Sequence, residues 1–125
     1  MKKRLAILLW ATDPAQPHLC GTPFFHAAAA AAMDAEVEVY FASRSVKLLR
    51  KGIAERIYPG PARERSVLQY MRHAAEHGAK FYACSQSLAA HGVAERELIP
   101  EVSGQAGAAA WMGRCLDESW ATLVY

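Results

Sequence analysis

Cys84 is the residue whose type and position most directly indicate chemistry in this sequence. It follows the short apolar run Lys80-Phe-Tyr-Ala83 and is followed by small polar residues. This pattern predicts a strand that delivers a thiol to the carboxyl edge of an open α/β sheet, where such folds bind their ligands. A thiolate there is a nucleophile, and donors of the next turn stabilise it. We expect the residues after Cys84 to contact the substrate: Ser85, Gln86, Ser87 and His91.

A structural role for Cys84 is the alternative interpretation, since free cysteines are commonly small buried apolar residues. In that case Cys84 would end the strand without taking part in chemistry. The reactive interpretation requires a sulfur that is exposed and has a lowered pKa.

Cys20 is the second candidate, because Leu19-Cys-Gly-Thr-Pro-Phe24 predicts a helix that starts just after it. A helix amino terminus favours a thiolate, and Gly21 permits an unusual backbone turn. We expect Gly21 and Thr22 to line the substrate site and Cys20 to assist Cys84, by sharing a sulfur atom or by forming a disulfide. A structural thiol in the site wall is the alternative. If Cys20 assists, Cys20→Ser alters reactivity or sulfur retention.

The remaining candidates carry weaker signals. Cys115 lies at helical spacing with Trp111 and Met112, which predicts a place in the core. The histidines lack the spacing of a metal site, and the chain has neither GxGxxG nor GxxxxGK[ST]. We therefore expect no metal and no cofactor.

The elements that position these residues alternate between strand and helix. Apolar runs predict strands over 4–10, 37–42, about 80–84 and 122–125. Apolar periodicity predicts helices over 22–33, 43–50, 66–77 and 104–116. Residues 85–91 are expected to form a turn or short helix, and the segment from there to Pro100 has no assignment. This alternation predicts a doubly wound α/β domain, with a mostly parallel sheet and helices on both faces. The first loop and the loop after Ala83 then leave the same edge, so we expect Cys20 and Cys84 to be neighbours.

Length and composition fit one domain over residues 1–125. The chain is 53% hydrophobic and 21% charged, as in ordinary globular proteins, and its three widely spaced cysteines predict no disulfide framework. A reducing, cytoplasmic setting is the simplest expectation. The basic start and apolar run over 1–11 are a poor match to a signal peptide and favour a buried strand, and the apolar stretch 24–33 is too short to span a membrane.

Charge is unevenly distributed although the net charge is only +2. Residues 44–65 contain seven lysines and arginines against Glu55 and Glu64. This region could dock an acidic protein partner or attract anions, or it could be an ordinary solvated surface. A nucleic-acid partner is not expected, because no recognition helix or exposed aromatic series accompanies the basic residues.

The chain resembles DsrE/DsrF-like sulfur-relay proteins over nearly its whole length. The resemblance lies in the first strand, the alanine-rich helix from Phe24 to Met33, the strand Glu36-Val-Glu-Val-Tyr-Phe41, and Phe81-Tyr-Ala-Cys-Ser85. It implies that Cys84 accepts sulfane sulfur as a persulfide and passes it to a partner such as a TusA-like carrier. It also implies a homotrimer or hexamer.

Two other kinds of function remain open from the sequence. The domain could be a small-molecule-binding module, or a regulatory oligomer whose cysteines carry no chemistry. Exposure to polysulfide discriminates among them, because only a reactive Cys84 gains sulfur mass.

Overall fold

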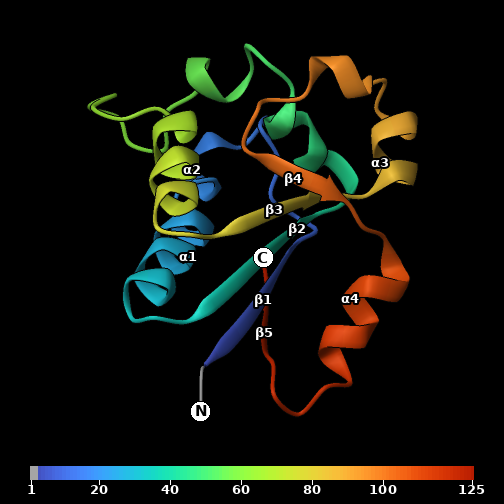
Figure 1. Cartoon of the computed structure of the whole chain (residues 1–125). Coiled ribbons are helices and arrows are strands. Elements are labelled where there is room, and N and C mark those ends of the chain that lie inside the picture. The colour runs from blue at the N-terminus through green and yellow to red at the C-terminus, as the bar shows by residue number, and fades with distance from the viewer. Residues whose placement is uncertain (1–2) are drawn as a thin grey trace.

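The computed structural model describes residues 3–125, so Met1 and Lys2 of the expected single domain lie outside the described residues. Over this range one sheet is formed by β1 (Arg4–Leu9), β2 (Glu36–Phe41), β3 (Lys80–Ala83), β4 (Val102–Gln105) and β5 (Ala121–Val124). The strand order is β4-β3-β2-β1-β5, and every adjacent pair is parallel. The sheet is thus wholly parallel, and the predicted α/β class is confirmed (Figure 1).

Helices cover both faces of this sheet. The main ones are α1 (Thr22–Ala32), α2 (Val67–Glu76), α3 (Ser85–Ala90) and α4 (Ala108–Cys115). α1 and α2 lie against each other on one side of the sheet, whereas α4 lies on the other side beside β1 and β5 (Figure 1). The predicted short helix after β2 is a 3-10 helix over Ser43–Leu49.

Local sequence explains where α2 begins. Ser66 Oγ accepts the N–H of Gln69, and the Gln69 side chain accepts the N–H of Ser66, which satisfies two amides that the first helical turn leaves free. Gly78 follows the helix at φ +105°, a backbone conformation that glycine adopts without steric cost.

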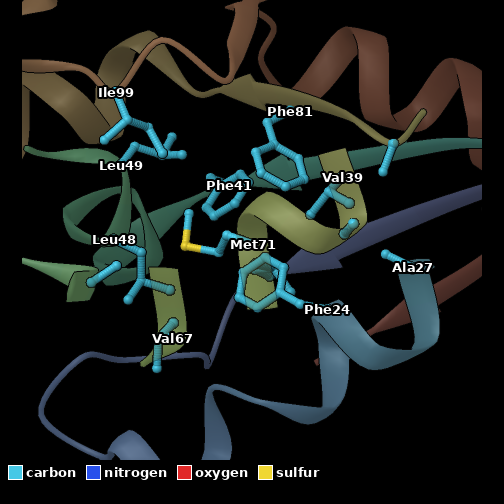
Figure 2. Close-up of a cluster of buried hydrophobic side chains, with 14 of the residues drawn as sticks. Phe24, Ala27, Val39, Phe41, Leu48, Leu49, Val67, Met71, Phe81 and Ile99 are labelled. Carbon is cyan, nitrogen blue, oxygen red and sulfur yellow. The ribbon is translucent and has the colours of Figure 1, made fainter. Parts of the chain in front are cut away.

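The larger core lies between the sheet and the α1–α2 layer. Phe24 of α1 stacks 6.0 Å from Phe41 of β2, and Phe41 meets the edge of Phe81 of β3 at 5.3 Å (Figure 2). Val39 and Met71 belong to the same fully buried cluster. Burial of these side chains is the main favourable contribution to the stability of the domain.

Strand alternation separates this core from a smaller one on the α4 face. Ile7 and Phe41 belong to the larger core, whereas Ala6 and Tyr40 pack in a second cluster with Trp120. Neighbouring positions along a strand point to opposite faces, so β1 and β2 each contribute to both clusters. Most of the buried apolar side chains lie on the α1–α2 side, and the α4 side is thinly covered.

Two sequence expectations near the end of the chain are wrong. Val102–Gln105 is a strand, and the helix expected from Gly104 begins only at Ala108. Val-Ser-Gly-Gln has little β-forming character, and the strand lies at the edge of the sheet, next to a register irregularity in β3. The core position expected for Cys115 is the second wrong expectation. Cys115 is exposed and no residue of α4 is buried, because α4 contacts the sheet through few side chains.

Candidate functional site

Cys84 lies at the carboxyl edge of the sheet, as the sequence predicts. Its N–H donates to Phe41 O at 2.9 Å, and the N–H of Ala106 donates to Ala83 O at 3.0 Å. These bonds continue the β2–β3 and β3–β4 ladders past the last strand residues. Cys84 is therefore fixed between the ends of β2 and β4, with its side chain half-buried.

The surroundings of the sulfur favour its ionised form. Burial alone would raise the pKa of Cys84, but the hydroxyl of Ser87 and the backbone N–H groups of Ser87 and Gln86 outweigh it and lower the pKa below the ordinary 9.0. The side chain makes no conventional capping hydrogen bond to α3 in this conformation. The pKa of Cys84 is therefore lowered by several nearby donors acting together, and not by a single capping hydrogen bond.

Ser43 orients the most important of these groups. The Ser43 N–H donates a 2.9 Å hydrogen bond to Ser87 Oγ, which leaves the Ser87 hydroxyl proton available to the sulfur of Cys84. Ser43 has φ +55°, a left-handed conformation that is unfavourable for residues other than glycine. Sequence reasoning missed Ser43, because a serine after a strand is a common turn residue.

A partly enclosed cavity of about 170 Å³ opens beside Cys84. It is lined by Leu8, Tyr40, Phe41, Ala42, Cys84, Ala106, Gly107, Ala108 and Trp111. Its wall is almost entirely nonpolar. The thiol thus has the polar donors of α3 on one side and the apolar cavity, which α4 covers, on the other.

An ion pair joins α4, which covers the cavity, to β2 of the sheet. Arg114 of α4 donates to both oxygens of Glu38 in β2, at 2.7 and 3.1 Å, and its guanidinium lies 4.2 Å from the ring of Trp120. Tyr40 adds a 2.7 Å hydrogen bond to the same carboxylate. Burial raises the pKa of Glu38, but the Arg114 guanidinium and the Tyr40 hydroxyl lower it by more than burial raises it. The net shift of the pKa is therefore downward.

Trp111 completes this attachment. Its ring meets Tyr40 edge-on at 5.6 Å, which is a favourable aromatic geometry. Burial and the neighbouring Glu38 carboxylate raise the pKa of Tyr40 to about 12, so Tyr40 stays a neutral hydrogen-bond donor. Sequence reasoning missed Tyr40, Glu38 and Arg114, since their pairing joins strand and helix across 76 positions.

Cys20 lies in a different environment from Cys84. It is fully buried within the larger core, and its thiol donates to Asp13 O at 3.3 Å and Gln16 O at 3.6 Å. Burial and the Asp13 carboxylate raise the pKa of Cys20 to about 11. The expected Cys20 thiolate is therefore contradicted, and its assisting role stays a prediction that this environment disfavours. Both thiols are free, with no disulfide between them.

The other expected site residues do not line the Cys84 cavity. Gly21 has an ordinary φ of −89°, and a Cβ there would come within 3.2 Å of Pro59, so close packing and not an unusual turn accounts for this glycine. Thr22 is the exposed first residue of α1. His91 lines a separate depression of about 430 Å³ with Asp13, Arg44, Lys47 and Arg50. Ser85, beside Cys84, is exposed. Substrate contacts by these residues remain predictions.

A depression of about 790 Å³ lies at the amino ends of β2 and β3, far from the chemistry of Cys84. The described residues that line it include no cysteine or serine. Within residues 3–125 no group of three or more His, Cys, Asp or Glu side chains is arranged to hold a metal ion. None of the helices described is long and apolar enough to span a membrane.

Comparison with known proteins supports the fold and the family resemblance. The model of the DsrE/DsrF-like family matches residues 6–124. The crystal structure of the ychN protein from E. coli superposes with a TM-score of 0.77 at 13% identity, covering all of both chains. MTH1491, a protein of unknown function from Methanobacterium thermoautotrophicum, gives a TM-score of 0.69 at 20% identity over 99% of this chain and all of its own. No curated protein sequence matches the chain.

Proposed function

The chain belongs to the DsrE/DsrF-like family, which is implicated in sulfur relay, and on that premise we propose that it carries sulfane sulfur as a persulfide on Cys84. The observation that carries this proposal is the half-buried thiol with a lowered pKa at the carboxyl edge of the sheet. A thiolate is the form that attacks sulfane sulfur, and partial exposure leaves the product within reach of a second thiol.

The transfer requires no redox partner. The Cys84 thiolate attacks the outer sulfur of a donor, a new S–S bond forms at Cys84, and the donor's S–S bond breaks with its electron pair leaving on the donor thiolate. A partner thiolate then attacks the outer sulfur of the Cys84 persulfide, and Cys84 regains its thiolate. The hydroxyl of Ser87 stabilises the negative charge on Cys84 before and after the transfer.

A TusA-like sulfur carrier or a related relay protein is the proposed acceptor. The depression lined by Arg44, Lys47 and His91 is rich in basic side chains. The 3-10 helix Ser43–Leu49, which carries Arg44 and Lys47, packs against α3, and α3 begins just after Cys84. A basic surface near the thiol favours an acceptor with acidic residues around its own cysteine. Arg44 and Arg50 are paired with Asp13 and Glu97, which leaves Lys47 as the cation best placed for such a partner.

Self-association as a homotrimer or hexamer is also proposed. Apolar side chains are exposed on α4, directly after it and on the edge strand β5: Met112, Leu116, Leu123 and Val124. Leu116 is 79% and Val124 62% exposed, and large apolar side chains with this much exposed surface are candidates for burial between copies of the chain. A second copy of this chain is the proposed occupant. The three free thiols fit a reducing compartment, for which the cytoplasm is the proposed location.

Peptide-resolved mass spectrometry after exposure to inorganic polysulfide tests the carrier function. We expect a gain of about 32 Da per sulfur on Cys84, because its thiolate is the reactive form. The Cys84→Ser variant should keep the fold, measured by circular dichroism, and lose stable sulfur loading altogether. Since Cys115 is exposed, the experiment is done in a Cys115→Ser background. Equal sulfur gain with and without Cys84 contradicts the proposal.

A further inference from the structure

The cavity beside Cys84 provides information on the sulfur donor. Cys84 lies in its wall, so a molecule held in the cavity touches the nucleophile directly. Tyr40 and Trp111 contribute aromatic surface, and Ala106 and Ala108 keep the cavity open because their side chains are small.

An anionic donor has no partner in this cavity. Apart from the Cys84 thiolate, which repels an anion, none of the described residues that line it carries a charge, and the Tyr40 hydroxyl already donates to Glu38. The backbone around Gly107 adds almost no polar surface to the wall. Transfer of a sulfonate or carboxylate from water into such a hollow costs its hydration without compensating hydrogen bonds. Thiosulfate-like ions are therefore disfavoured as occupants.

The size and the surface of the cavity fit a compact apolar group. Its volume of about 170 Å³ is close to that of an engineered apolar cavity of roughly 150 Å³ that encloses benzene, so it accepts a ring or chain of about six to eight heavy atoms. Divalent sulfur is polarisable and makes favourable contacts with aromatic rings such as those of Tyr40 and Trp111.

We propose that this cavity binds uncharged sulfane sulfur, as an elemental-sulfur ring or an organic polysulfane of similar size, and presents it to Cys84. This inference rests on the proposed carrier function and adds the class of donor. Attack of the Cys84 thiolate forms one S–S bond and breaks one in the donor. In a ring the electron pair stays on the far end of the opened chain as its terminal thiolate, and in an open polysulfane it departs on the released thiolate. The acceptor thiolate then attacks the sulfur bonded to Cys84 Sγ and forms an S–S bond to it, while the bond to Sγ breaks and its electron pair returns to Cys84 as the thiolate.

Three sulfur donors of different charge test the proposal on the full chain. Cyclooctasulfur and diallyl trisulfide are uncharged, whereas the tetrasulfide dianion carries charge. Cys115 is an internal reference, because it is an exposed thiol on the same molecule but does not line the cavity. We expect the ratio of loading at Cys84 to loading at Cys115 to be about tenfold higher for at least one uncharged donor than for tetrasulfide, as burial of an apolar group predicts. A preference for one uncharged donor over the other identifies its source as elemental sulfur or organic polysulfane.

Two matched variants assign the preference to the cavity. Ala108 and Ala109 are adjacent exposed alanines in the first turn of α4, but only Ala108 lines the cavity. We expect Ala108→Leu to fill the cavity and abolish the preference for uncharged donors, while loading by tetrasulfide is unchanged. Ala109→Leu should retain the preference.

The outcomes separate the two proposals. If tetrasulfide loads Cys84 and neither uncharged donor shows a higher ratio, the apolar donor is refuted and the carrier function stands. The apolar donor is also refuted, and the carrier function stands, if Ala108→Leu and Ala109→Leu have the same effect on the preference for uncharged donors. If no donor loads Cys84 in folded protein, the carrier function itself fails.

Discussion

The backbone N–H of Ser43 and the hydroxyl of Ser87 are joined by a 2.9 Å hydrogen bond that links the end of β2 to α3. Because Ser87 Oγ accepts this bond, its own proton is free for the sulfur of Cys84, whose pKa it helps to lower. The reactivity of the thiol thus depends on a neighbouring strand end as well as on its own helix. The unfavourable φ of Ser43 is a conformation maintained by the surrounding structure.

Ser87→Ala is expected to slow the reaction of Cys84. Loss of the hydroxyl donor raises the pKa of Cys84 toward its ordinary value, so less thiolate is present at neutral pH. A hydrogen bond to a charged group contributes about 1.5–3 kcal/mol, so alkylation by iodoacetamide near neutral pH should slow by roughly tenfold. The pH–rate profile should shift to higher pH. Ser85→Ala is the control, since Ser85 does not contribute to the shift, and an equal effect of both variants would reject the role of Ser87.

Cys20 is expected to react far more slowly than Cys84 in the folded protein. Its thiol is fully buried and its pKa is raised to about 11, so the thiolate forms only as the pH rises toward that value, whereas Cys84 ionises at lower pH. Differential alkylation at mildly alkaline pH, followed by labelling in denaturant, measures this order. We also expect Cys20→Ala to leave the rate of Cys84 loading unchanged. A clear loss of loading in this variant, with the fold intact, would restore the assisting role predicted from the sequence.

Glu38→Gln is expected to loosen α4. The change removes the charge that pairs with Arg114 and should lower the free energy of unfolding by roughly 1–3 kcal/mol, measured by urea denaturation. Because the pKa of Glu38 is lowered on folding, its contribution is present above the ordinary value of 4.5 and is lost as the pH falls through the folded-state pKa. The difference between variant and parent should therefore shrink in acid.

Glu36→Gln provides the control for this experiment. Glu36 pairs with Arg4, but both side chains are about 40% exposed, and exposed pairs contribute little. We expect a change within about 0.5 kcal/mol. Equal destabilisation by the two substitutions contradicts the special role of the Glu38–Arg114 pair.

Leu116→Glu is expected to weaken self-association. Leu116, directly after α4, is 79% exposed, so the substitution adds a charge to the proposed interface without disturbing the core of a single chain. Light scattering coupled to size-exclusion chromatography should show a lower mass. Met33→Glu is the matched control, because Met33 is also exposed, at 68%, but follows α1, which packs on the opposite face of the sheet from α4 (Figure 1). A monomeric parent protein rules out the proposed assembly.

The sequence predicts most of the fold because hydrophobic pattern and turn residues act locally. The strand before Cys84 and the helix after Ser66 are visible in the order of apolar and polar residues. β4 is not visible, because its pairing with β3 and its place at the sheet edge stabilise a segment with weak propensity of its own. Likewise, the spacing of Cys115 predicts an apolar helix face but not whether anything covers that face.

Cys84 could be predicted from its place after a strand, but its surroundings could not. The cavity joins residues from four separate segments, and Trp111 lines it from α4, which the Glu38–Arg114 ion pair joins to the sheet. The sequence could not decide whether Cys20 lines this cavity or packs in the larger core, where it lies. That choice depends on strand register and loop path, which the order of residue types does not specify.

Sulfur transfer from Cys84 to an acceptor thiol is the most direct test of the carrier function. The Cys115→Ser variant, loaded with isotopically labelled sulfur on Cys84, is mixed with a reduced TusA-like carrier, and both proteins are followed by intact-mass spectrometry. We predict that Cys84 loses the labelled sulfur while the acceptor cysteine gains it, and that the Cys84→Ser variant transfers none. Label that never enters Cys84, or that stays on it while the acceptor remains unmodified, contradicts the account.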